Sequence, residues 1–245
     1  MSINQIGGYR METDLIQELA EDEMPLFPLE VVLFPGGVLP LHIFEQRYRL
    51  MIQYCLDNDR LFGIVLIKKG REVGEHAEPY LVGTAVKIIE VDRLEDGRMN
   101  LITLGQHRFK ITKIRRDLPY LVGQVKVFEA DDTESAEDSE MHGVRAIQLY
   151  RTYESLLAEL IPQWKVIEEI PTVPDHLSYQ IATRLQIPLT DKQQLIETMS
   201  IHQLLSREIE LLERENRRLK ISLLARRSFE KHDTNISPWK NASLN

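Results

Sequence analysis

The pattern of apolar and polar positions changes character near residue 130. Before it, apolar residues come in short runs or alternate with polar ones, as in "LFGIVLI" at Leu61–Ile67, which is typical of β-strands. Glu95-Asp96-Gly97 between two such runs predicts a tight hairpin, because Asp-Gly tolerates positive φ angles. "PYLVG" occurs twice, at Pro79–Gly83 and Pro119–Gly123, and we interpret both copies as entries into strands of one barrel.

After residue 140 the apolar residues recur at i, i+3 and i+4, which predicts helices. We expect helices over 142–160, from Pro174 to about Gln186, and from Ile201 to about Arg227. Thr190 and Ser200 each begin a Ser/Thr-x-x-Gln pattern, which is typical of a helix N-terminus.

These patterns predict an α+β fold, with a β-rich domain that forms a small barrel or sandwich, followed by helices of which the last is long. We expect a disordered head at 1–23, the β-rich subdomain at 24–130, an acidic linker at 131–140, the helical subdomain at 141–230 and a disordered tail at 231–245. The linker lies in "EADDTESAEDSE", which has no basic residue and does not have the ligand spacing of an EF-hand.

The most unusual stretch is "PLEVVLFPGGVLPLHIFEQRYRLM", from Pro28 to Met51. It has neither the spacing of a phosphate-binding loop nor a G-x-S-x-G nucleophile elbow. Residues 34–37 predict a tight turn, with proline fixing one φ and glycine permitting a positive one. A strand and an amphipathic helix should follow. We expect one helical face to carry Phe44, Tyr48, Met51, Ile52, Cys55 and Leu56.

Composition narrows the class of protein. The 245 residues are 43% hydrophobic and carry a formal net charge of −8. No apolar run approaches the roughly 20 residues that span a bilayer, and the acidic N-terminus does not resemble a targeting signal. Cys55 is the single cysteine, which excludes an intramolecular disulfide and a multi-cysteine zinc site. We therefore expect a cytoplasmic protein that does not bind membranes.

Nothing in the sequence indicates catalysis or a cofactor. Cys55 falls on an apolar helix face, where a buried, inert thiol is expected. The seven histidines are scattered and form no H-E-x-x-H pattern. We predict no catalytic residues, no metal and no cofactor.

The stretch "PLFPLEVVLFPGGVLPLHIFEQRYRLM" resembles the opening of the N-terminal substrate-recognition domain of Lon proteases, particularly its stand-alone bacterial versions. The similarity continues through "VGTAVKIIEVDRLEDGRMNLITLGQHRFKI" and "PDHLSYQIATRLQIPLTDKQQLIETMSIHQLLSREIELLERE", and covers about Pro25–Glu215. It implies a six-stranded, PUA-like barrel followed by a helical bundle with a long last helix.

The resemblance also implies binding of exposed apolar segments of unfolded or tagged client proteins. A full Lon chain continues into an ATPase module and a serine–lysine protease domain, and this sequence contains neither. We therefore expect a non-catalytic adaptor or regulator of protein quality control, which works with or without a separate ATP-dependent protease. The candidate protein-binding residues surround the predicted turn: Leu33, Phe34, Pro35, Val38, Leu39 and Pro40. The alternative is that these side chains pack onto the barrel.

Self-association is a second hypothesis. The last helix carries a heptad-like stripe that would suit a homodimer, with Asn216 at a register-fixing position. The candidate self-association residues are Leu205, Ile209, Leu212, Asn216, Leu219 and Leu223. Glu208 and Glu213 would face like charges in such a dimer, and further leucines lie off the stripe, so packing within one chain is favoured. Glu210–Arg214 and Glu213–Arg217 should form i, i+4 ion pairs.

RNA binding is a third hypothesis, which rests on the kinship with PUA domains. The candidate cations are Arg108, Lys110, Lys113, Arg115 and Arg116. A strand would divide them between two faces, so nucleic acid is not the expected partner.

Overall fold

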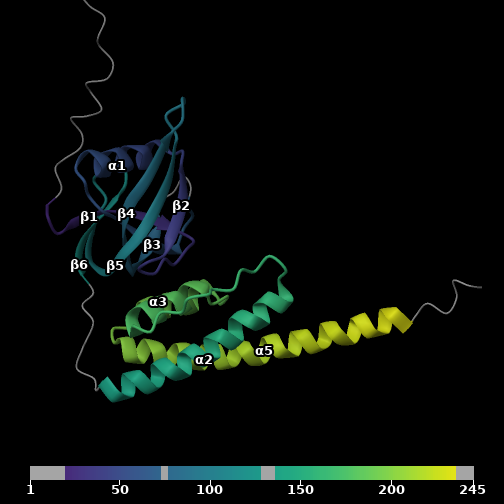
Figure 1. The fold of residues 1–245 in the computed structure, drawn as a ribbon. Helices are drawn as coiled ribbons and strands as arrows, with labels where there is room; N and C mark the ends of the chain where they lie inside the picture. The colour runs from purple at the N-terminus through teal and green to yellow at the C-terminus, as the bar shows by residue number, and fades with distance from the viewer. Residues whose placement is uncertain (1–19, 73–76, 128–135, 236–245) are drawn as a thin grey trace, which may run out of the picture. The chain divides into compact units, whose positions relative to one another are not determined.

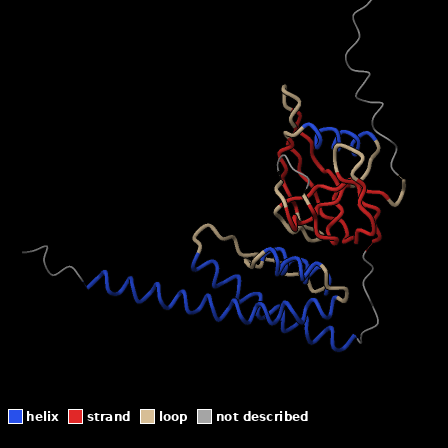
Figure 2. Tube along the Cα trace, turned by 180° about the vertical axis from the view of Figure 1, so that it is seen from behind, coloured by secondary structure: helices blue, strands red, loops and turns tan. Residues whose placement is uncertain are grey.

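The computed structural model describes residues 20–72, 77–127 and 136–235. Their contacts divide the chain into two compact units. We call the first the strand unit (residues 1–130 with 182–199) and the second the helical unit (131–181 with 200–245). Strands gather in the former and long helices in the latter (Figures 1 and 2).

The strand unit contains a six-stranded sheet with the order β2-β5-β4-β3-β1-β6. The strands are β1 (Glu23–Leu29), β2 (Val38–Ile43), β3 (Phe62–Lys69), β4 (Glu78–Arg93), β5 (Met99–Arg115) and β6 (Leu121–Val127). β1 pairs parallel to β3, and the other pairings are antiparallel. β5 also pairs with β6, so five strands form a closed ring to which β2 is added at the edge.

Two clusters of buried side chains fill the strand unit. The larger includes Met51, Ile52 and Cys55 of α1 (Gln46–Asp57), which pack with residues of the strands. The smaller centres on Leu26 and Phe109. Full burial of an aliphatic or aromatic side chain contributes about 1.5–3 kcal/mol, so these clusters dominate the stability of the unit.

The two copies of "PYLVG" lie at the beginnings of β4 and β6. In each copy the glycine lies against a neighbouring strand. A Cβ on Gly83 would come within 2.3 Å of the Ile64 carbonyl oxygen, and one on Gly123 within 3.0 Å of Leu26 Cδ1. The repeated motif therefore supplies glycine where strands of the ring approach closely.

The turn predicted at residues 34–37 is present. The Gly37 amide donates to the Phe34 carbonyl at 3.0 Å, and Gly36 has a φ of 76°. The α1 helix that follows buries its predicted face, with one exception. Phe44 precedes the helix and is 49% exposed, so its assignment to that face was wrong.

In the helical unit α2 (Ala136–Leu160) and α5 (Ile201–Asn235) run parallel and side by side (Figure 1). Arg145 pairs with Glu213 at 2.8 Å near the start of α2, and Arg226 donates to the Leu160 carbonyl at 3.4 Å at its end. α3 (Pro174–Arg184) begins at the predicted proline, and the boundary between the units falls within it.

Several predicted boundaries differ from the structure. Helix α2 begins at Ala136, inside the expected linker, and α5 continues to Asn235, inside the expected tail. Glu23 lies in β1, whereas most of the expected head falls outside the described residues. Segment 182–199, expected in the helical subdomain, belongs by its contacts to the strand unit.

Of the two predicted helix caps, the structure has the one at Ser200 and not the one at Thr190. α4 (Leu189–Ile196) follows Pro188, which takes the N-cap position without a side-chain hydrogen bond, so the cap at Thr190 was wrong. Ser200 does precede α5, and its hydroxyl accepts a hydrogen bond from the Gln203 amide at 3.3 Å. No helix in the described parts of the chain is long and apolar enough to cross a membrane.

Candidate protein-binding surface

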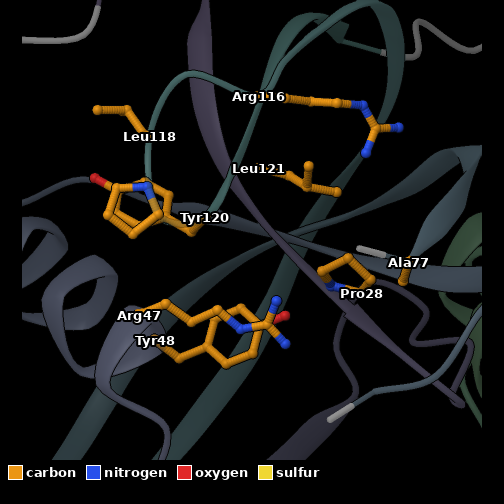
Figure 3. A pocket seen from close by; sticks show the side chains of 9 residues that line it. Pro28, Arg47, Tyr48, Ala77, Arg116, Leu118, Tyr120 and Leu121 are labelled. Atoms are coloured by element: carbon orange, nitrogen blue, oxygen red, sulfur yellow. The ribbon is translucent and has the colours of Figure 1, made fainter. Parts of the chain in front are cut away.

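A recess in the strand unit has two arginines beside apolar walls, including Pro28 and Leu118 (Figure 3). It offers only about 10 Å³ to water, which is room for about one molecule. Its Arg47 donates to a Glu45 carboxylate oxygen at 3.1 Å and lies 4.5 Å from the centre of the Tyr48 ring. Burial raises the pKa of Tyr48 to about 12. The recess is therefore too small for a substrate, and its tyrosine is poorly suited to acid–base chemistry at neutral pH.

Cys55 is buried as predicted, and burial raises the pKa of its thiol to about 12. A neutral, enclosed thiol is a poor nucleophile. Among the described residues, no group of three histidine, cysteine, aspartate or glutamate side chains could hold a metal ion.

The predicted protein-binding residues separate into a buried and an exposed set. Leu33 is 6% exposed and Phe34 is 1% exposed, so these two pack inside the strand unit, as the alternative reading had it. Leu39 and Pro35 are half-buried, and Leu39 packs against the larger core cluster. Val38 and Pro40 are exposed on β2. Of the predicted residues, Val38 and Pro40 are therefore the two that lie exposed, and both belong to the strand that follows the turn.

Cross-strand pairing adds two further apolar residues beside them. Val38 lies opposite Leu104, and Pro40 lies opposite Ile102. Directly opposite residues of an antiparallel pair point to the same face, so all four share one face of β2 and β5. Val38 is 58% exposed, Pro40 is exposed, and Ile102 and Leu104 are half-buried. We call this set the β2–β5 face.

Polar groups border the β2–β5 face at the far end of β2. His42 Nδ1 lies 2.7 Å from Asn100 Oδ1, and the Asn100 amide donates to Asp92 at 3.2 Å. On the β4 side, Lys87 and Glu90 are opposite Leu104 and Ile102 and bring one charge of each sign. An apolar patch with a polar border is the usual anatomy of a protein-binding site.

The edge position of β2 explains why proline is tolerated there. Among the described strands β2 pairs with β5 alone, so one side of it forms no ladder. Proline on an edge strand can turn the side that lacks an N–H away from the sheet, and it discourages unspecific strand pairing. The face therefore offers side-chain contacts more readily than backbone pairing.

Sequence reasoning missed Ile102 and Leu104. The signal was present in "MNLITLG", because alternate residues of a strand lie on opposite faces: Asn100, Ile102 and Leu104 on one, and Met99, Leu101 and Thr103 on the other. Both faces carry apolar residues, although only the face of Met99, Leu101 and Thr103 is buried. An excess of apolar residues on the solvent-facing side of this strand could have identified the patch.

The predicted RNA-binding cations are partly used inside the strand unit. Arg108 is 2% exposed and donates to backbone carbonyls at the end of α4. Arg115 lies 2.8 Å from Glu23 and 2.6 Å from Asp117. Three exposed cations of the set remain, at Lys110, Lys113 and Arg116. These contacts weaken the RNA hypothesis because they neutralise or bury two of its five cations.

The predicted self-association stripe packs within the chain. Leu205, Leu212, Asn216 and Leu223 are buried, while Ile209 and Leu219 are half-buried. The Asn216 amide donates to the Leu149 carbonyl of α2 at 3.0 Å, so the register-fixing residue binds a helix of its own chain. Ile209 lines an open groove of about 460 Å³ between α2 and α5.

Comparison with known proteins connects this architecture to one family. Residues 23–214 match the family described as the ATP-dependent protease La (LON) substrate-binding domain. Lon protease 2 of Myxococcus xanthus is 29% identical over 201 residues, which is 81% of this chain and 24% of that protein. The Lon protease of Aquifex aeolicus is 30% identical over 224 residues, or 85% of this chain and 27% of its own length. This chain thus spans about a quarter of these relatives.

Solved structures agree with that relationship. The Lon N-terminal domain protein from Xanthomonas campestris is 28% identical, with a TM-score of 0.55, over 76% of this chain and 95% of that one. The N-terminal domain of the Mycobacterium avium complex Lon protease has a TM-score of 0.59 at 18% identity, over 78% and 98%. The second similarity concerns the fold alone.

Proposed function

The chain belongs to the LON substrate-binding domain family, and from this premise we propose that it recognises protein substrates through exposed apolar segments. The observation that carries the proposal is the β2–β5 face, where Val38, Pro40, Ile102 and Leu104 form an apolar patch at a sheet edge. Such a face suits unfolded or tagged clients, because their apolar side chains are accessible only outside a folded core.

We assign the chain a non-catalytic role, as an adaptor or regulator in protein quality control. The recess beside Arg47 is too small for a substrate, the thiol is buried, and the larger groove between α2 and α5 is open, which suits binding better than chemistry. A separate ATP-dependent protease is the partner that would turn recognition into degradation. Co-purification followed by peptide identification tests this role, and recovery of clients together with an ATPase–protease subunit is the expected result.

We also assign the closed ring of five strands, with β2 added, to a PUA-like barrel. The pairing of β5 with β6, which leaves no open edge within the ring, supports this assignment. The parallel packing of α2 and α5, with α3 joined to α5 through Ser178, supports a helical bundle.

Replacement of Val38 by aspartate tests the β2–β5 face directly. A permanently unfolded client, reduced and carboxymethylated α-lactalbumin, serves as the probe in a fluorescence anisotropy titration. In the complex, an aspartate at this position would be buried against apolar groups without a partner for its charge, so Val38→Asp should weaken binding about tenfold. Leu104→Asp should act in the same direction.

Val127→Asp is the matched control. Val127 also lies on a strand and is 58% exposed, the same fraction as Val38, but it belongs to β6. This variant should bind the client like the unmodified protein. Equal loss in both variants, or no loss in either while circular dichroism shows intact folding, would remove the β2–β5 face from the proposal.

A further inference from the structure

The second half of α5 carries an apolar stripe that nothing in the described residues covers. Ile221 is 68% exposed, Leu224 is 64% exposed and Phe229 is 76% exposed. With Ala225 and Ser228 they follow the i, i+3, i+4, i+7, i+8 pattern of one helical face. Leu223, one position away from Leu224, is 8% exposed and belongs to the stripe that packs within the chain. This part of α5 therefore has two apolar faces, and only one of them is packed.

The same segment reverses the charge of the protein. Residues 214–229 contain six basic residues and one acidic residue, a net charge of +5. The whole chain carries −8, so the remainder carries −13. At about 1.5 Å per residue the segment is roughly 24 Å long, which concentrates this charge on a few turns of helix.

Some of these cations contact α2, whereas others form no ion pair with a described residue. Arg227 pairs with Glu159 at 2.8 Å, and Arg226 donates to a carbonyl of α2. Arg217 and Lys220 are exposed, and neither forms an ion pair with a described residue. Glu213, four residues before Arg217, pairs with Arg145 of α2, so the expected Glu213–Arg217 pair was wrong.

We propose that the exposed face formed by Arg217, Lys220, Ile221, Leu224 and Phe229 docks an acidic amphipathic segment of a protein partner. We call this set the α5 face. Its apolar side chains would meet apolar groups of the partner, and the two cations, which lie at the N-terminal end of the face, would meet carboxylates. This inference goes beyond the proposed function, because the α5 face lies in the helical unit and not on the client-binding strands.

Charge and shape favour this occupant over three others. A second copy would bring a like charge of +5 against the same face, which opposes a symmetric pairing of this helix. Nucleic acid requires cations close to phosphates, and exposed isoleucine, leucine and phenylalanine obstruct that approach. A lipid surface suits a helix with a broad apolar half, but here the other apolar stripe is packed against α2.

The test uses the full chain and a synthetic helical peptide that has leucine on one face and glutamate on both flanks. Isothermal titration should detect binding that weakens as salt is raised, because the charges lie at the surface. The analogous peptide with lysine in place of glutamate should not bind. Arg217→Glu with Lys220→Glu, and separately Ile221→Ser with Leu224→Ser, should each reduce affinity about tenfold.

Two controls locate the effect. Arg151→Glu reverses one charge at an exposed position of α2, compared with two in the α5 variant, and Val144→Ser removes one apolar side chain that is 53% exposed there. Both should bind the glutamate peptide like the unmodified protein. The proposal is overturned if the peptide does not bind, or if the four α5 substitutions leave binding unchanged. It is also overturned if vesicles of equal phosphatidylcholine and phosphatidylserine, a single-stranded RNA or a second copy binds this face more tightly than the peptide.

Discussion

The strand unit and the helical unit each bury a charged side chain, and they treat it differently. Arg108 of β5 donates to the carbonyl oxygens of Ile196, at 3.1 Å, of Thr198, and of Met199, at 3.4 Å. These carbonyls lie at the end of α4, where helix acceptors lack partners and the dipole is negative. Glu208 of α5 is fully buried, and it accepts a hydrogen bond from the Ser178 hydroxyl at 3.0 Å.

The difference concerns how far the surroundings compensate each of these two buried charges. Arg108 connects β5 with a segment about 90 residues later in the sequence, and its charge meets several acceptors. The second carboxylate oxygen of Glu208 has no hydrogen-bond partner among the described residues, and burial raises the pKa of this group well above its usual value. The strand unit also leaves the buried Tyr120 hydroxyl without a hydrogen-bond partner among the described residues. We therefore infer that the units differ in how they treat a buried charge: carbonyl acceptors compensate the charge of Arg108, whereas burial favours the neutral form of Glu208.

The largest effect should come from a methyl group added to the strand ring. In Gly83→Ala the new Cβ would meet the backbone oxygen of Ile64, which cannot rotate away, so we expect a loss of about 3 kcal/mol in the free energy of unfolding. Gly143→Ala in α2 is the counterpart, because a Cβ there meets nothing within 4 Å. That variant should gain about 0.5–1 kcal/mol. Urea denaturation of both variants measures the contrast, and a similar sign for the two would contradict it.

Replacement of Arg108 by methionine should be the next most costly change. The substitution keeps much of the side-chain volume but leaves the carbonyls at the end of α4 without their donor, at a cost of about 2–3 kcal/mol. Hydrogen exchange should rise across Leu189–Ile196, the span of α4. Lys110→Met on the same strand is the control, since an exposed change should stay within about 0.5 kcal/mol. Undisturbed exchange in α4 would show that Arg108 does not hold that helix.

Glu208→Gln should stabilise the helical unit. The raised pKa means that the folded state keeps the Glu208 proton, while the unfolded state releases it above about pH 4.5. Stability should therefore fall as pH rises above that value, and the amide should remove this dependence. We expect a gain of about 1–2 kcal/mol at neutral pH, measured by thermal unfolding at several pH values. A loss at neutral pH would mean that the ionised carboxylate has compensating partners.

Glu23→Gln should give the smallest effect, with the opposite dependence on pH. A hydrogen bond from Arg115 is the main cause of the lowered pKa of Glu23. Its contribution is present above the unfolded pKa and is lost as pH falls through the lower folded value. Solvent screens the pair, so we expect a loss below about 1 kcal/mol at neutral pH. Acid titration monitored by circular dichroism should show a flatter curve for the variant, and an unchanged curve would assign the acid response to other carboxylates.

Local signals in the sequence were sufficient where neighbours in the chain determine the structure. Pro35 and Gly36 fixed a turn, Ser200 capped a helix and Pro174 began one, because each acts within a few residues. For Leu33 and Phe34 two placements stayed open, on a binding surface or packed onto the barrel, and the structure has them packed. Alternation distinguishes two sides of a segment, but which side faces the core depends on strands far along the chain.

The candidate site shows the same limit. Val38 and Pro40 could be singled out from their own stretch, but Ile102 and Leu104 joined them through the register of β2 against β5. The inclusion of residues 182–199 in the strand unit likewise depends on contacts such as that of Arg108. Patterns within one sequence describe near neighbours in the chain and do not show which distant segments pair.

The return of α4 to the strand unit also bears on how the protein is made. A ribosome releases the chain from its N-terminus, so all six strands emerge well before the carbonyls that accept from Arg108. During that interval the guanidinium does not have these acceptors, and we expect the ring to be less stable than in the finished chain. A nascent chain arrested once residue 130 has left the exit tunnel should accordingly be protease-sensitive, and protection should arrive only once α4 has left it too.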